Sequence, residues 1–235
     1  MTARSGLLAR SAAIALPMLA WAGAAAAHAI GGKDAAFVKA VHGPEPFPFA
    51  YLGAKHMVTG YDHLLFLVGV IFFLFRLRDI ALYVTMFSLG HSLTLLAGVY
   101  LNLRADSHVV DAIIGLSVVY KAFDNLGGWR TLTGVQPDGR AAVLAFGLAH
   151  GFGLATKLQA LNLNREGLLA NIVSFNVGVE VGQLIALSLI LLAMTPWRRT
   201  PLFGPTAVAA NTLLMLAGFV LAGQQVAEFA LGSPA

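Results

Sequence analysis

The sequence predicts an all-α fold: a polytopic membrane helix bundle of about six transmembrane helices behind a cleaved signal peptide. Hydrophobic residues make up 58% of the 235-residue chain and charged residues only 11%, whereas soluble domains carry roughly 25% charged residues. Six long apolar runs follow one another between residues 56 and 226, each near the ~20 residues that cross a bilayer as a helix. Helices are required because lipid offers no partner to a free backbone group.

The N-terminal segment, residues 1–27, has the features of a secretory signal peptide. Arg4 and Arg10 precede and begin an apolar stretch, and small residues follow it up to Ala27, as expected before a cleavage site. Cleavage there makes His28 the mature N-terminus. An uncleaved anchor helix is the alternative.

The remaining chain divides by composition. We expect an outer-facing, turn-rich segment at 28–55, a six-helix transmembrane domain at 56–226 and an outer-facing tail at 227–235. The six spans are expected near residues 56–75, 79–101, 108–127, 141–161, 168–194 and 206–226.

Arginines in the loops indicate the orientation of the spans. A mature N-terminus outside places the first, third and fifth turns inside. These inner turns carry six arginines and the two short outer loops carry two, in agreement with the positive-inside rule. The inner arginines are Arg76, Arg78, Arg130, Arg140, Arg198 and Arg199, and the outer ones are Arg104 and Arg165.

Charge and cysteine content exclude several classes of site. The formal charge of +4 reflects these arginines and does not indicate a nucleic-acid partner. The chain has no cysteine, which excludes disulfides, iron–sulfur clusters and thiolate metal sites.

Polar groups in the first span lie where such residues usually face a bundle interior and mark function. Asp62 and His63 are about seven residues beyond its outer end, and His56 precedes His63 by seven residues. A straight helix would separate the two histidines by ~10 Å, too far to share an ion easily. We therefore expect His56 in a non-helical lead-in or at an outer site above a deeper one.

Further polar residues lie in later spans. His91 and His150 are near the middle of the second and fourth spans. In the fifth span, Asn176, Glu180 and Gln183 form one stripe at helical spacing.

These groups together predict a metal site. A lone intramembrane histidine is often an interhelical hydrogen-bonding group, but three histidines and two carboxylates on four spans supply ligands that suit divalent nickel, cobalt, zinc or copper. Imidazole must be neutral to bind a metal, so the site is also coupled to protons. Lys121 and Asp124 are interpreted as a local helix ion pair.

An internal similarity relates the second and fourth spans. The segment Phe87–Leu95 is similar to Phe146–Leu154, with the histidines 59 residues apart. On the predicted topology both segments run from inside to outside. Duplication and chance similarity between apolar helices both stay open.

At these residues the sequence resembles the HupE/UreJ family of membrane proteins and, more distantly, the nickel/cobalt permease superfamily. The first-span signature His-x5-Asp-His is present at His56, Asp62 and His63. The stretch Phe87–Ser92 is similar to the Phe-x-x-Gly-His-Ser pattern of the permeases, and Phe175–Glu180 resembles the Phe-Asn-x-Gly-x-Glu stretch of the second HupE/UreJ subgroup.

A later family motif is present only in part. His150 and Gly151 match it, but Phe146 stands where a first histidine is expected and Gly153 where a glutamate is expected. We infer that Glu180 replaces the missing carboxylate from another helix.

The resemblance implies a secondary permease, not an enzyme, in the bacterial inner membrane, with the mature N-terminus on the periplasmic side. Nickel or cobalt is the implied substrate, copper and zinc stay open, and no tightly bound cofactor is expected. The lipid bilayer is a partner; a homo-oligomer and metalloenzyme-maturation partners stay open. The expected metal-binding residues are His28, His56, Asp62, His63, His91, His150, Asn176 and Glu180, with His42 also placed to collect the ion outside.

Two other functions are weighed. An intramembrane zinc hydrolase also uses three histidines and a carboxylate, but neither His-Glu-x-x-His nor Gly-x-Ser-x-Gly occurs in the chain. A b-type haem protein with His91 and His150 as axial ligands is the third interpretation.

Overall fold

The computed structural model describes residues 32–161 and 164–232, and these ranges contain helices and no strand. The predicted all-α bundle is confirmed. The predicted signal peptide and His28 lie outside the described residues. The helices are α2 (Gly32–Ala40), α3 (Pro46–Thr59), α4 (Tyr61–Ile71), α5 (Leu77–Leu101), α6 (Ser107–Asn125), α7 (Gly128–Thr133), α8 (Gly139–Ala160), α9 (Leu168–Arg198) and α10 (Phe203–Ala230).

Four of the described helices, α5, α8, α9 and α10, are long and apolar enough to cross a membrane. The other two expected spans correspond to α6 and to the consecutive helices α3 and α4. Helix α6 has 19 residues, but Asp111, Lys121 and Asp124 lower its hydropathy. The chain is therefore a multi-pass membrane protein, with four helices rather than six meeting the length and composition of a span.

The first span differs from the single helix expected at residues 56–75. Helix α3 begins at Pro46, so the expected domain boundary at 56 falls inside it, and the chain leaves the helical conformation at Gly60 (φ −74°, ψ 105°) before α4 begins. Proline suits a first helical turn, where its missing N–H leaves no bond unmade. A Cβ on Gly60 would lie only 2.9 Å from His63 Nδ1 and 3.0 Å from Asp62 Oδ1, so the break needs a glycine.

Two aspartates fix where later helices begin. The Asp106 carboxylate accepts backbone N–H groups at the start of α6. The Asp138 carboxylate does the same for α8, from Arg140 at 2.8 Å and Ala141 at 3.2 Å. These backbone hydrogen bonds stabilise the ionised form, so the pKa of Asp138 is lowered.

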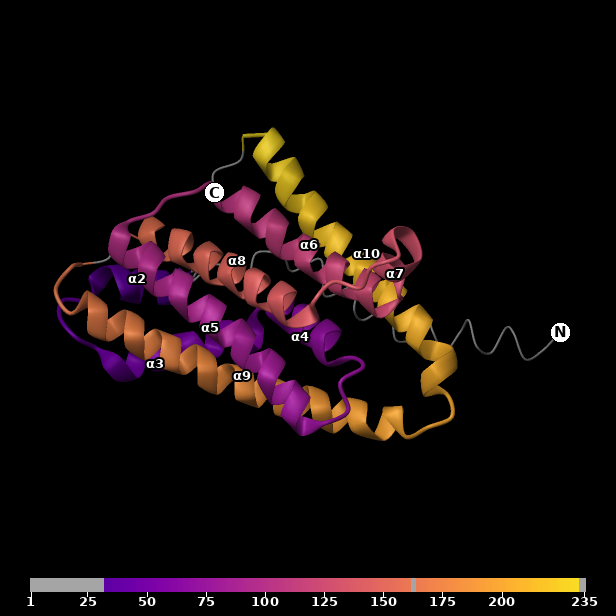
Figure 1. Ribbon diagram of the computed structural model, residues 1–235. Coiled ribbons are helices and arrows are strands. Elements are labelled where there is room, and N and C mark those ends of the chain that lie inside the picture. Colours follow the sequence, from indigo (N-terminus) through magenta and orange to yellow (C-terminus); the bar gives the residue numbers. More distant parts are fainter. Residues whose placement is uncertain (1–31, 162–163, 233–235) are drawn as a thin grey trace.

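Helices α5 and α8 lie side by side (Figure 1) and run in the same direction. Gly147 faces the carbonyl of Phe87, and Gly151 faces the carbonyl of His91, one turn further along both helices. Glycine lets two helix backbones approach this closely. The two similar segments found in the sequence are therefore neighbours in the structure.

Two more helix pairs are joined in the same way. In the α3–α9 pair, Gly53 faces the carbonyl of Phe175 and Gly178 faces the carbonyl of Ala50. In the antiparallel α6–α10 pair, Gly115 lies against Ala222. Figure 1 shows α4 inside the bundle formed by these three pairs.

Helix α4 contributes Phe66, Val70 and Ile71 to the larger hydrophobic core, together with residues from the helices around it. Its carboxyl end is capped from α9, because the Arg198 guanidinium donates to the carbonyls of Ile71, Phe72 and Leu74. These bonds satisfy carbonyls that the short helix leaves without an internal partner. The position of α4 fixes the residues at its other end.

Candidate functional site

A cluster of four histidines from four helices surrounds the start of α4. The His63 ring centroid lies 5.0 Å from that of His56 on α3, 6.0 Å from that of His91 on α5 and 4.9 Å from that of His150 on α8. The expected separation of ~10 Å between His56 and His63 is wrong, because the chain breaks at Gly60. The expected non-helical lead-in is wrong, since His56 lies within α3. An outer site at His56 above a deeper one stays a prediction.

Asp62 orients the His63 ring. One carboxylate oxygen lies 2.9 Å from His63 Nδ1 and also accepts the backbone N–H of His63 at 2.8 Å. With the carboxylate ionised, Nδ1 carries the hydrogen and Nε2 keeps its lone pair. Metal-binding histidines are commonly oriented by a carboxylate in this way. Asp62 therefore holds the ring at Nδ1 and leaves Nε2 available to bind an ion.

His150 has a different partner. Its Nε2 lies 3.1 Å from the hydroxyl oxygen of Ser117 on α6. The Ser117 hydroxyl lies 2.6 Å from the carbonyl oxygen of Ile114 and donates to it. Helix α6 therefore also contacts the cluster, through Ser117 and the His150 ring of α8. The sequence analysis did not single out Ser117.

Five imidazole nitrogens of this cluster are buried and have no hydrogen-bond partner among the described residues. They are His56 Nε2, His63 Nε2, both nitrogens of His91, and His150 Nδ1. Buried polar atoms normally have a partner, and an exception calls for an explanation such as an ion or a water. Within the described ranges, no three His, Asp or Glu side chains are already arranged so that they could hold a metal ion together.

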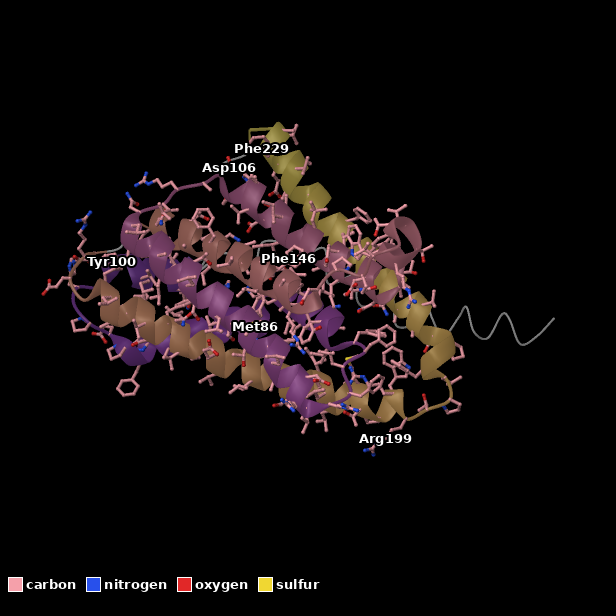
Figure 2. The ribbon with its side chains drawn as sticks, viewed as in Figure 1. Met86, Tyr100, Asp106, Phe146, Arg199 and Phe229 are labelled. Atoms are coloured by element: carbon pink, nitrogen blue, oxygen red, sulfur yellow. The ribbon has the colours of Figure 1, made fainter. Side chains whose placement is uncertain are left out.

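A layer of phenylalanine rings lies one helical turn from the histidines, toward the arginine-rich loops. Phe66 follows His63 on α4, and Phe87 and Phe146 precede the histidines of α5 and α8. The Phe66 ring is 5.4 Å from Phe87 and 5.8 Å from Phe146. Figure 2 shows Phe146 in the middle of the bundle, with Tyr100 toward one end and Arg199 toward the other. The layer closes the arginine-rich side of the cluster.

The polar stripe of α9 faces α5. The Asn176 amide donates to Ser92 Oγ at 2.8 Å, and the Ser92 hydroxyl donates to Glu180 Oε1 at 3.5 Å. One turn along, the Ser88 hydroxyl donates to Gln183 Oε1 at 2.7 Å. The Glu180 carboxylate therefore bonds the residue after His91.

A half-open pocket of about 540 Å³ lies between α5 and α9 beside this stripe. Its walls combine aliphatic side chains with five polar ones, of which four form two hydrogen-bonded pairs, Ser88 with Gln183 and Ser92 with Glu180. The polar residues of the wall are Thr85, Ser88, Ser92, Glu180 and Gln183. Glu180 thus has space on the α5 side in which its carboxylate can change position.

Comparison with known proteins identifies the chain. The family model described as HupE / UreJ protein matches residues 32–233. The chain belongs to the HupE/UreJ family. This family is associated with nickel and cobalt transport and is not a family of enzymes. No curated protein and no solved structure matches the chain.

Other ionisable residues of this HupE/UreJ protein lie apart from the histidine cluster. His42 is exposed and contacts Asn164 at 2.8 Å, so its predicted collecting role stays a prediction. His108 contacts Gln225 at 2.9 Å and Glu228 at 3.4 Å between α6 and α10. The predicted local pair is present: Lys121 Nζ and Asp124 Oδ2 are 2.5 Å apart.

Two features of this HupE/UreJ site escaped sequence reasoning. Ser117 is one small polar residue in an apolar span, and the only available signal was its position near mid-depth. The phenylalanine layer is hard to find in the sequence because Phe66, Phe87 and Phe146 come from three different helices. Their spacing of three or four residues from the histidines was a usable signal.

Proposed function

We propose that this protein is a secondary permease that carries nickel or cobalt across the bacterial inner membrane. The observation that supports this best is the set of five buried ring nitrogens, without partners among the described residues, on His63 and the three histidines around it. Neutral imidazoles bind nickel, cobalt, copper and zinc. Copper and zinc are therefore the competing substrates.

With the arginine-rich loops in the cytoplasm, the phenylalanine layer lies on the cytoplasmic side of the histidines. The ion arrives from the periplasmic side, where His56 and His63 meet, and exchanges water for imidazole nitrogens. Asp62 stabilises the positive charge through the hydrogen bond to His63. Passage to the cytoplasm requires the rings of Phe66, Phe87 and Phe146 to separate. The ion is the substrate, and its gradient or the membrane potential drives the movement.

Metal uptake into proteoliposomes tests this proposal, with nickel, cobalt, copper and zinc run side by side. We expect saturable uptake of nickel or cobalt that requires the protein and exceeds the uptake of copper and zinc. Protein-free vesicles give the background. Uptake no faster than this background for all four ions would contradict the proposal.

Packing favours the permease over a haem protein. The Phe87 ring lies 6.0 Å from His91 and 5.1 Å from His150, and His63 contacts both histidines. These side chains fill the space that a porphyrin would need between two axial ligands. A hydrolase gains no comparable support from the described residues.

Glu180 supplies negative charge that a divalent ion needs in a low dielectric. Glu180→Gln keeps the size of the side chain and removes its charge, so we expect weaker nickel binding. We expect the loss to exceed that in Asn176→Ala, which removes only the amide bonded to Ser92. Titration of the two purified variants with nickel measures the loss of affinity in each.

Glu228→Gln is the control for this pair, because Glu228 is a half-exposed carboxylate beside His108 and away from the cluster. It should bind nickel like the unchanged protein. Equal binding by Glu180→Gln and Glu228→Gln would assign Glu180 to helix packing.

A further inference from the structure

Ser117 is fully buried, with 0% of its surface exposed, where α6 meets α8. Its hydroxyl oxygen contacts two groups, the carbonyl oxygen of Ile114 at 2.6 Å and His150 Nε2 at 3.1 Å. A carbonyl oxygen can only accept a hydrogen bond, whereas a hydroxyl group can donate one and accept another. The Ser117 hydroxyl hydrogen is therefore directed to Ile114.

The bond from Ser117 to Ile114 determines which nitrogen of His150 carries the ring hydrogen. Since the Ser117 oxygen has given its hydrogen to Ile114, it can only accept from His150, and Nε2 must carry the ring hydrogen. A neutral imidazole has one N–H, so His150 Nδ1 keeps its lone pair. Nδ1 is also the nitrogen of His150 that is buried without a partner among the described residues.

We propose that Ser117 is a positioning residue that holds His150 in its Nε2–H tautomer and so presents Nδ1 to the metal ion. This inference rests on the proposed transport function. Helix α6 thereby takes part in binding although Ser117 itself does not touch the ion. Partners of this kind typically change metal affinity by ~10–100-fold when removed.

The proposal gives the two nearest rings of the cluster opposite tautomers. Asp62 holds the hydrogen of His63 on Nδ1, leaving Nε2 free, whereas Ser117 holds the hydrogen of His150 on Nε2, leaving Nδ1 free. The rings are 4.9 Å apart and nearly perpendicular, at 81°. Each supplies a different nitrogen to one ion.

Nitrogen-15 NMR of the purified, histidine-labelled protein without metal tests the tautomers directly, with the His150 signals assigned by their loss in His150→Gln. We expect a protonated Nε2 and an unprotonated Nδ1 for His150. Ser117→Ala should give a mixture of tautomers, whereas Ser117→Thr, which keeps the hydroxyl, should keep the tautomer of the unchanged protein.

Nickel titration of the same proteins supplies the second measurement. Ser117→Ala should bind nickel ~10–100-fold more weakly, and Ser117→Thr should restore most of the affinity. The matched control is Thr156→Val, because Thr156 is also buried and its hydroxyl also donates to the carbonyl three residues earlier, that of Gly153, but bonds no imidazole among the described residues. It should bind nickel normally.

The outcomes separate this inference from the proposed function. A protonated Nδ1 on His150 in the unchanged protein would overturn the role of Ser117, as would unchanged tautomer and affinity in Ser117→Ala. Failure of the unchanged protein to bind any of the four metals would overturn the proposed function instead. The tautomer measurement on the unchanged protein and on Ser117→Ala needs no metal, so it tests the inference even if the proposed function fails.

Discussion

Replacing His63 with alanine is expected to abolish metal uptake while leaving the protein inserted in the membrane. His63 is the centre of the cluster and contacts His56, His91 and His150. Loss of a direct ligand should weaken binding by more than ~100-fold, beyond the effect of removing a supporting residue. His91→Ala and His150→Ala are expected to have the same effect. Uptake into proteoliposomes and nickel titration measure it.

The control for the histidine variants is His108→Ala, because His108 is also buried but bonds Gln225 and Glu228 where α6 begins and α10 ends. Its uptake should stay near that of the unchanged protein. Normal uptake in both the His91 and His150 variants would show that these two rings serve packing alone.

Gly151→Ala is expected to prevent accumulation of folded protein. An added Cβ would overlap the carbonyl of His91 and lie 2.5 Å from Thr94 Oγ1, and a helix backbone cannot yield as a side chain can. Overpacking commonly costs 1–3 kcal/mol, and we expect about 3 kcal/mol or more here. The yield of monodisperse protein and its thermal unfolding in detergent measure the loss.

Gly223→Ala provides the matched control for Gly151→Ala. Both glycines lie inside long helices, but a Cβ on Gly223 would meet nothing within 4 Å. This variant should unfold at the same temperature or slightly higher, since alanine favours a helix over glycine by about 1 kcal/mol. Equal yield and unfolding temperature for the two variants would show that the α5–α8 contact tolerates a side chain.

Composition was sufficient to predict the fold class, because the lipid solvent requires long apolar helices. It was not sufficient to predict the break at Gly60. Residues on both sides are helix-compatible, and the break depends on Asp62 and His63 closing over a glycine that leaves room for them. Such a contact depends on tertiary structure and has no periodic signature.

The histidines of the site were predictable because an ionisable group at membrane depth is costly and therefore marks function. Their roles at atomic level were not. Whether Nδ1 or Nε2 faces the ion depends on the rotation of α4 and α8 and on Asp62 and Ser117. The bond from Ser92 to Glu180 likewise depends on how α9 is turned toward α5.

The glycine contacts described above also determine which parts of this transporter can move separately. Backbones that touch through Gly151 or Gly178 have no side chains between them to repack, so each helix pair behaves as one rigid body. His91 and His150 belong to the same body and keep their separation, whereas His56 belongs to another, and His63 lies on α4 after the Gly60 hinge. In the proposed transport cycle, a shear between these bodies would change the positions of His56 and His63 relative to His91 and His150, so the four histidines would not release the ion at the same time.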